Sequence, residues 1–261
     1  MQGIAIDCDD NVYITGSFTG MLGFGGTSAT LTASAGEGTD MWVVKFDGSS
    51  PTLYAIWSQQ STGTTDSVSG FAIATDSFNS VYVTGQLRGT TSFGTNTVTS
   101  TVQSTYITRL DSSGIVGVFQ WANINMGTAS LVPTSIDVDT NGNLFVYANF
   151  SGGAGQTVIF ASLISSFTTT LFSTTSNQAV AVARADTRTG NWNAAVLTNN
   201  TNTIQSPIPF ISNSLTIDPL GNVYITGLFT GAATFGGTTL YSSPDNFTSN
   251  TFVAKLTNNL S

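Results

Sequence analysis

Residues 11–27 read NVYITGSFTGMLGFGGT and residues 222–238 read NVYITGLFTGAATFGGT, with 13 of 17 aligned positions identical. The two copies begin 211 residues apart. The opening motif also returns more loosely, as SVYVTG at 80–85 and NLFVYA at 143–148. A motif that recurs at long, similar spacings indicates a structural repeat. The chain is therefore predicted to contain four copies of one unit.

Further segments recur around each copy of the motif. An apolar segment precedes each copy and ends, four residues before it, in an aspartate: Asp7, Asp76, Asp139 and Asp218. The segments WVVKFD, TYITRLD, AVAVARAD and TFVAKLT follow and begin at residues 42, 105, 179 and 251. In the first two units a last segment places Trp57 and Trp121 ten residues beyond Asp47 and Asp111. Trp192, in the third unit, is out of this register.

The recurring segments are short, rich in Val, Ile, Thr, Tyr and Phe, and bounded by Gly, Asn, Asp or Ser, which predicts β-strands. Four antiparallel strands with two apolar faces must stack on neighbouring sheets, as the blades of a β-propeller do. We therefore expect an all-β protein, a β-propeller of four repeat blades that is either closed or part of a larger propeller. A single domain, 1–261, is predicted, with blades at 3–66, 70–128, 135–200 and 214–261.

The series GIAID, NVYITGSFTG, FGG and DMWVVKFD, followed by a tryptophan, resembles the SBBP-type β-propeller repeat of bacterial and viral proteins. Units 1 and 4 match that repeat best. Unit 3 departs from it, with Tyr147 and Ala148 in place of Thr-Gly. The resemblance implies a propeller fold and a place among surface, adhesin-like or virion proteins.

Composition excludes several function classes. The net charge is −8 and only six residues are Lys or Arg, so binding of nucleic acid through phosphate neutralisation is not expected. Insertion into a membrane is not expected either, because no apolar run is long enough to span a bilayer. The chain has no histidine, which excludes Ser-His-Asp and Cys-His nucleophile systems and histidine metal sites. No cofactor is predicted.

Four of the six basic residues share one position of the predicted third strand: Lys45, Arg109, Arg184 and Lys255. A ring of such charges could bind an anion. The favoured interpretation is one ion pair per unit, because charges in half-buried strands need partners. The expected carboxylates belong to one of two repeated sets, either Asp7, Asp76, Asp139 and Asp218 or Asp47, Asp111 and Asp186.

The acidic residues could in principle act as metal ligands or as catalysts. Alternate oxygens of DCDDN at 7–11 could ligate calcium, but the further ligands of an EF-hand are absent. Asp40, Asp66, Asp137 and Asp245 lie outside the repeated sets, and no catalytic pair stands out among them. The expectation is therefore no metal site and no catalytic residue.

Two functional hypotheses follow. The first is a non-enzymatic module, displayed on a cell or virion surface, for structural assembly or for binding a protein or glycan. The alternative is a glycosidase-like, carbohydrate-active enzyme with a carboxylate pair in the propeller channel. Most aromatic residues occupy repeat positions and are assigned to the core. Trp192 is the exception and is predicted to be an exposed contact.

The fourth unit supplies only three of the four predicted strands. Its last segment, residues 251–256, is expected to present an open edge, and such edges recruit other strands. We therefore expect residues 251–256, and the opposite face near residues 3–7, to be covered by further blades, further copies or another protein.

Overall fold

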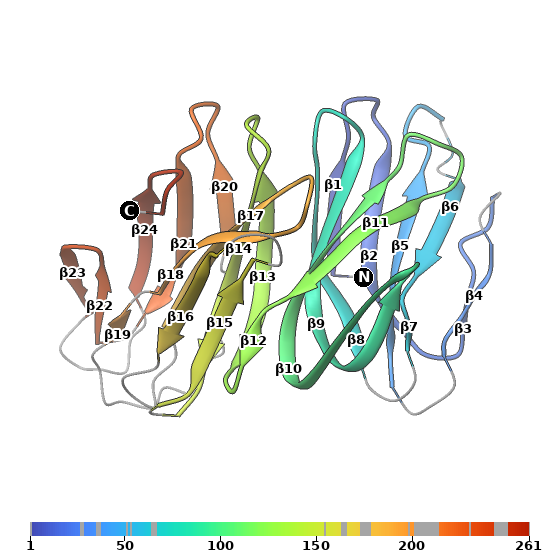
Figure 1. Cartoon of the computed structure of the whole chain (residues 1–261). Helices are drawn as coiled ribbons and strands as arrows, with labels where there is room; N and C mark the ends of the chain where they lie inside the picture. The colour runs from blue at the N-terminus through green and yellow to red at the C-terminus, as the bar shows by residue number, and fades with distance from the viewer. Residues whose placement is uncertain are drawn as a thin grey trace. The chain divides into compact units, whose positions relative to one another are not determined.

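The protein consists of antiparallel β-strands in the computed structural model shown in Figure 1, and the described residues contain no helix. The structure describes residues 2–26, 29–34, 38–50, 52, 54–63, 67–153, 155–162, 166–172, 179–197, 199–200, 214–229, 231–242 and 250–260. Within these ranges there is consequently no helix long and apolar enough to cross a membrane. The chain divides into two compact units, Met1–Ile124 with Thr187–Gly190, and Asn125–Asp186 with Asn191–Ser261.

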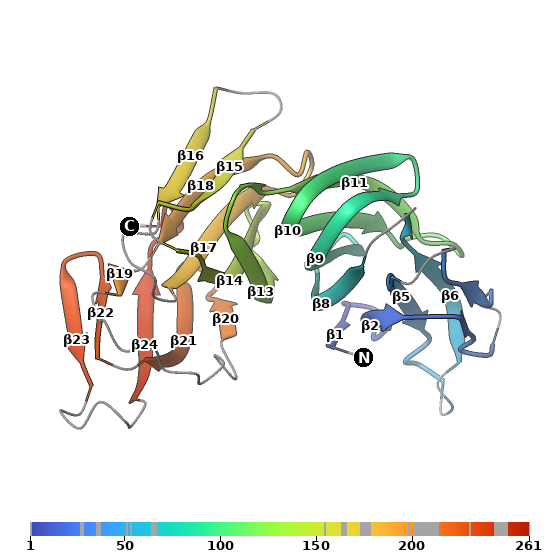
Figure 2. The same ribbon diagram turned by 90° about the horizontal axis from the view of Figure 1, so that it is seen from below.

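The first unit contains two principal sheets. The first sheet has the strand order β1 (Gly3–Ile6), β2 (Val12–Phe18), β5 (Asp40–Phe46) and β6 (Ala55–Gln60). The second sheet has β9 (Ser80–Phe93) paired with β8 (Val68–Thr75) and β10 (Asn96–Asp111), and β10 paired with β11 (Val118–Ile124). Figure 2 shows both sheets from below, with β8 next to β1.

The second unit repeats this arrangement. The third sheet has the order β13 (Ser130–Val138), β14 (Asn143–Ser151), β17 (Ala179–Asp186) and β18 (Trp192–Leu197). The fourth sheet has the order β20 (Ser214–Ile217), β21 (Val223–Phe229) and β24 (Asn250–Leu256). All pairings are antiparallel, and consecutive strands lie beside one another.

Smaller strands belong to the excursion between the second and third strands of a sheet. They form the hairpins β3 (Met21–Leu22) with β4 (Leu31–Thr32), β15 (Thr157–Ala161) with β16 (Thr168–Phe172), and β22 (Ala232–Phe235) with β23 (Thr238–Tyr241). A two-residue strand before each later sheet pairs with the excursion of that sheet: β7 (Thr62–Gly63) with β9, β12 (Met126–Gly127) with β15, and β19 (Asn199–Asn200) with β22. These pairings join each connection to the sheet that follows it.

Strand alternation gives every principal sheet two faces, because successive side chains point to opposite sides. One face carries Tyr13 and Lys45 in the first sheet and is named the tyrosine face; the opposite face carries Ile4, Ile14 and Val44 and is named the aliphatic face. The same register recurs in the other sheets. Each sheet therefore has two apolar surfaces to bury.

The core of the first unit lies between its two sheets. Tyr13, Val43 and Trp57, from the tyrosine face of the first sheet, share one cluster with Ile73 and Val83, from the aliphatic face of the second. A glycine is required before β11, because a Cβ atom on Gly117 would lie 2.8 Å from the Trp57 ring. Tryptophan and glycine thus fit together where the two sheets meet.

The core of the second unit is formed by the same pair of faces. Phe145 and Val182, from the tyrosine face of the third sheet, pack with Leu215, Val223 and Ile225, from the aliphatic face of the fourth. In both units the tyrosine face of the earlier sheet covers the aliphatic face of the later one.

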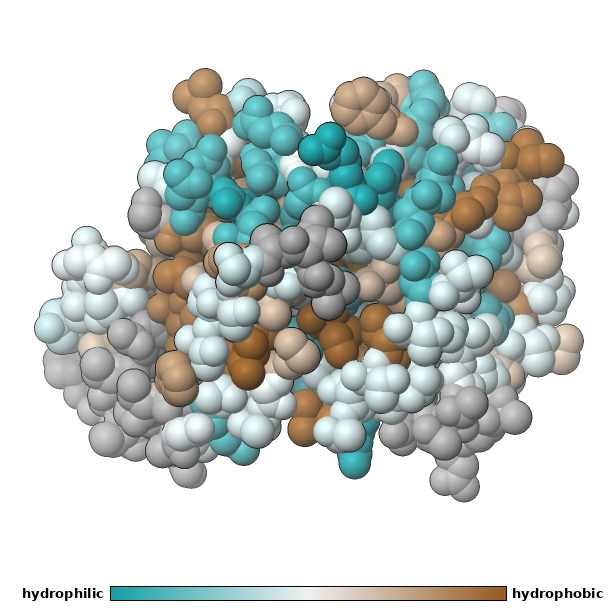
Figure 3. Space-filling view, viewed as in Figure 1, coloured by the Kyte–Doolittle hydropathy of each residue, from teal (hydrophilic) through white to brown (hydrophobic). Residues whose placement is uncertain are grey.

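The prediction of an all-β protein is confirmed, and the four repeats correspond to the four principal sheets. The prediction of a single domain over 1–261 stays a prediction. Residues 201–213, between the third and fourth predicted blades, lie outside the described residues. The face of the molecule drawn in Figure 3 is covered mainly by pale and teal side chains, as expected for a chain in which only 8% of residues are charged and Ser, Thr and Asn are common.

Candidate functional site

A carboxylate-centred turn joins the first and second strands of each principal sheet. Asp7 Oδ1 accepts hydrogen bonds from the backbone N–H groups of Asp9 and Asn11, both at 2.9 Å. The same two bonds recur in the other sheets: Phe78 and Ser80 donate to Asp76, Asn141 and Asn143 to Asp139, and Leu220 and Asn222 to Asp218. The four repeat aspartates therefore occupy equivalent places and make the bonds that an Asx turn requires.

The fourth residue of each turn has a left-handed backbone. Its φ is 62° at Asp10, 59° at Asn79, 82° at Gly142 and 83° at Gly221. Aspartate, asparagine and glycine are the residues that adopt this conformation most readily. The sequence pattern of the turn thus has a backbone cause.

The second carboxylate oxygen binds side chains. Asp7 Oδ2 accepts the Tyr13 hydroxyl at 2.8 Å and the Asn11 amide at 2.9 Å. Equivalent tyrosines donate to Asp76 at 2.8 Å and to Asp218 at 3.2 Å. The third sheet has Phe145 at this position, and there Asp139 Oδ2 accepts the Asn143 amide at 2.8 Å.

These hydrogen bonds change the acidity of the turn. Burial raises the pKa of Asp7, but the bonds from Asn11, Tyr13 and the turn amides outweigh it, so the pKa lies below its ordinary value. The bond from the Asn222 side chain lowers the pKa of Asp218. Both groups are therefore anions at neutral pH that serve as hydrogen-bond acceptors within the turn.

The four basic residues lie on the tyrosine faces, and the two lysines lie over aromatic rings. Lys45 Nζ is 5.6 Å from the centroid of the Tyr13 ring, and Lys255 Nζ is 5.5 Å from that of Tyr224. Arg109 lies in register between Tyr82 and Trp121. These positions are suited to cation–π contacts.

Two of these cations make the same hydrogen bond to the next sheet. Lys45 Nζ donates to the carbonyl of Ser112 at 3.0 Å, and Arg184 Nη1 donates to the carbonyl of Asn258 at 2.6 Å. Ser112 and Asn258 are equivalent residues, each one position after the last residue of the recurring third-strand segment. The Tyr13 hydroxyl also lies 2.8 Å from Ser112 Oγ, so the first two sheets share a buried polar cluster.

The hydrogen bonds of three of the four cations go to uncharged groups, and the prediction of one ion pair per unit stays a prediction. Lys45 and Arg184 donate to neutral carbonyls, Arg184 also to the side-chain oxygens of Asn193 and Asn259, and Arg109 Nη2 to the Ser80 hydroxyl at 2.9 Å. The first set of repeat carboxylates accepts hydrogen bonds within its own turns. The charges of Arg109 and Asp111, and those of Arg184 and Asp139, are nevertheless close enough to interact. An anion site shared by all four cations stays a hypothesis.

Two acidic residues outside the repeated sets, Asp40 and Asp137, also accept hydrogen bonds. Asp40 is buried and accepts hydrogen bonds from Ser34 and Ser61. Asp137 accepts the N–H groups of Val138 and Ile217, and burial raises its pKa. Asp66 and Asp245 lie outside the described residues. In the described ranges no three His, Cys, Asp or Glu side chains are grouped so that they could hold a metal ion.

The prediction of an exposed contact at Trp192 is wrong. The side chain is 0% exposed, and its ring meets that of Phe160 edge to face at 4.9 Å between centroids. A β-bulge between Arg184 and Ala185 pairs Trp192 with Ala185. Bulges at the same place in the first two sheets pair Ala55 with Phe46 and Phe119 with Leu110. Trp192 therefore fills a repeat position that residue counting from Asp186 does not reveal.

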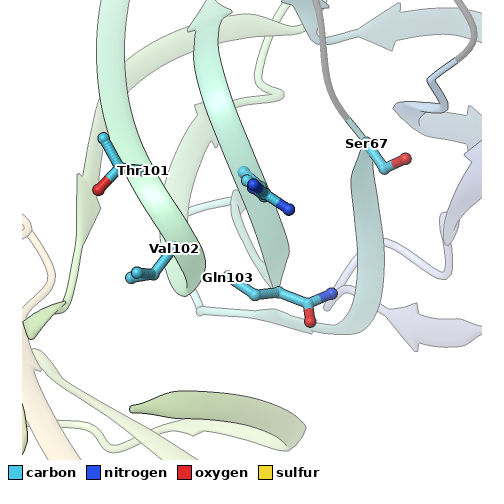
Figure 4. A pocket seen from close by; sticks show the side chains of 5 residues that line it. Ser67, Thr101, Val102 and Gln103 are labelled. Atoms are coloured by element: carbon cyan, nitrogen blue, oxygen red, sulfur yellow. The ribbon is translucent and has the colours of Figure 1, made fainter. Parts of the chain in front are cut away.

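A surface pocket in the second sheet was not anticipated from the sequence. It has a volume of about 510 Å³ and is lined by Ser67, Arg88, Thr101, Val102 and Gln103. Figure 4 shows Gln103 extending towards the strand that begins after Ser67. The pocket lies where the register between β9 and β10 shifts, between Ser100 and Ser104. A pocket with a guanidinium and an amide group is suited to polar ligands, and none of its described lining residues carries a carboxylate.

No protein-family model matches the chain, and a search of curated proteins finds no similar protein. The resemblance to the SBBP-type repeat therefore stays an expectation drawn from the residues.

Proposed function

We propose that the chain is a non-enzymatic repeat module of the β-propeller type, displayed on a cell or virion surface, that serves structural assembly or binds a protein or glycan. In this proposal the four principal sheets are blades. The loops between strands, and the pocket at Arg88, are the contact surfaces.

The stacking of successive sheets is the observation that carries this proposal. In both units the tyrosine face of one sheet packs on the aliphatic face of the next, and a cation donates to an equivalent carbonyl across the boundary. Repeat proteins bury sheets with two apolar faces in this way, by packing each sheet on the next through the same two faces in the same order.

The use of the charged residues supports a structural or binding role. The repeat aspartates accept turn hydrogen bonds, and the repeat cations contact rings, carbonyls or hydroxyls. The side chains of these repeated positions thus hold strands and sheets together. The sequence of the loops is rich in Ser, Thr, Asn and Gly, and such uncharged polar residues suit hydrogen bonding to a glycan or a protein surface.

The test is a glycan array and a pull-down from extracellular material with the purified chain, each repeated with Arg88→Ala. Binding of a defined glycan or protein is expected, and a weaker signal for the variant would place the contact at the pocket. Turnover of glycosides by the purified chain, measured in parallel, would contradict the proposal and favour a carbohydrate-active enzyme.

A further inference from the structure

The first sheet exposes an aliphatic position that is buried in every other sheet. Ile4 pairs in register with Ile14 and is 61% exposed. The residues at the same register position in the other sheets are buried: Ile73, Ile136 and Leu215. The aliphatic face of the first sheet therefore lacks the cover that its counterparts have in the described part of the chain.

The fourth sheet has the opposite exposed face. Val253, on its tyrosine face, is 72% exposed, whereas Val43 at the same register position of the first sheet is 0% exposed. Lys255 is exposed, while its equivalent Lys45 is buried and donates to the Ser112 carbonyl. The tyrosine face of the fourth sheet therefore carries the equivalents of the residues with which the first sheet contacts the second. In the fourth sheet, Val253 and Lys255 are exposed instead.

The two exposed faces are of the two kinds that pack on each other inside each unit, one tyrosine face and one aliphatic face. A tyrosine face with Tyr224, Val253 and Lys255 matches the one formed by Tyr13, Val43 and Lys45. The carbonyl that corresponds to that of Ser112 is, in the first sheet, the carbonyl of Gly48.

Charge favours the same match. Asp9, Asp10 and Asp47 lie on the turns around Gly48, and the backbones approach so closely that a Cβ atom on Gly48 would overlap the Asp10 carbonyl oxygen. A lysine ammonium directed at this carbonyl would enter a negatively charged environment, which favours a cation.

We infer that the tyrosine face of the fourth sheet binds the aliphatic face of the first sheet of a second copy of this chain, with Lys255 donating to the carbonyl of Gly48 of that copy. The contact is head-to-tail, so it generates rings or filaments rather than a closed symmetric pair. The inference deepens the proposed assembly role and rests on it.

The test is sedimentation velocity over about 1 to 100 µM with the wild-type chain, Ile4→Arg, Val253→Asp and an equimolar mixture of the two variants. The wild-type chain is expected to form oligomers whose mass rises with concentration. Each variant keeps one intact face and is expected to be monomeric alone. The mixture is expected to form a 1:1 dimer and nothing larger, because only one pair of intact faces remains.

Two further variants complete the design. Ile115→Arg changes a side chain that is also exposed but lies on neither face, and it should assemble like the wild-type chain. Lys255→Met keeps an apolar stem and loses the ammonium group, and it should weaken association about tenfold, as expected for one hydrogen bond from a charged donor. Near-ultraviolet circular dichroism of each variant establishes that it is folded.

Several outcomes would overturn the inference. These are a wild-type chain that is monomeric throughout, or a mixture of the two variants that fails to dimerise. Glycan and protein binding by the monomeric variants separates the two proposals. Binding without self-association would leave the binding role standing and reject only the head-to-tail contact.

Discussion

The first and third sheets carry the same turn with different side chains around it. Asp7 accepts bonds from two turn amides, the Asn11 side chain and the Tyr13 hydroxyl. Asp139 accepts from two turn amides and the Asn143 side chain, and Phe145 replaces the tyrosine. The bonds to the backbone are kept while the hydroxyl is lost. The backbone bonds therefore define the turn, and the side-chain bonds are additions to it.

A second difference lies two residues further along the second strand. Thr15 Oγ1 donates to the Trp42 carbonyl at 2.8 Å, and the equivalent threonines of the second and fourth sheets donate in the same way. The third sheet has Tyr147, whose buried hydroxyl has no hydrogen-bond partner among the described residues. In the third sheet, a threonine with a hydrogen-bonded hydroxyl is thus replaced by a tyrosine, whose larger ring fills more of the core.

Substitution of Trp192 should have the largest effect on the third sheet. Trp192→Ala removes a fully buried ring that packs on Phe160, and it is expected to lower the free energy of unfolding by about 3–5 kcal/mol. Urea denaturation followed by circular dichroism measures this loss. Arg188→Ala, on the turn before β18, is the control for a change outside the core. A cost below about 1 kcal/mol would show that Trp192 is exposed.

Loss of the turn carboxylate should cost more in the first sheet than in the third. Asp7→Ala leaves the donors of Asp9, Asn11 and Tyr13 without their acceptor and is expected to cost about 3 kcal/mol, against about 2 kcal/mol for Asp139→Ala. Asp7→Asn should cost less than Asp7→Ala because one acceptor oxygen remains. Equal costs for Asp7→Ala and Asp139→Ala in chemical denaturation would remove the distinction between the two turns.

The two tyrosines should respond in opposite directions when the hydroxyl is removed. Tyr13→Phe loses the bonds to Asp7 and Ser112, and it is expected to cost about 1–1.5 kcal/mol. Tyr147→Phe removes a buried hydroxyl without a described partner, so it should be neutral or stabilising by up to about 1 kcal/mol. A loss at Tyr147 comparable to that at Tyr13 would indicate that its hydroxyl is satisfied by bound water.

The turns were predictable because their cause is local. An aspartate at a fixed offset, followed by Asn, Asp or Gly, encodes both the Asx turn and the positive φ of the fourth residue. The order of strands within each sheet was predictable as well, because consecutive short strands with tight turns pair with one another.

The hydrogen-bond partners of the cations and the buried position of Trp192 were not predictable from the amino-acid sequence. Lys45 and Arg184 donate to backbone carbonyls of another sheet, and any residue supplies a carbonyl, so no sequence signal marks these acceptors. Trp192 follows Asp186 by six residues, whereas Ala55 and Phe119, which occupy the same paired position, follow Asp47 and Asp111 by eight, so a shorter turn puts the tryptophan out of register in the sequence. The pocket at Arg88 depends on a register shift in β10. In each case the missing information is spatial.

The smallest expected effect is a difference in pH dependence between Asp7 and Asp137, one in the first sheet and one in the third. The pKa of Asp7 is lowered by folding, so its stabilisation is complete above the ordinary value of 3.8 and is lost as the pH falls through the folded value. The advantage of the wild-type chain over Asp7→Asn should therefore shrink in acid.

Burial raises the pKa of Asp137, so its ionised form opposes folding above the folded value, and that penalty disappears as the pH falls through it. The stability of Asp137→Asn relative to the wild-type chain should thus improve as the pH rises from about 3 to about 7, whereas that of Asp7→Asn should worsen. Urea denaturation of the three proteins across this range measures both slopes. Slopes of the same sign would show that these two carboxylates have similar surroundings, because only opposite shifts in pKa make the stabilities diverge.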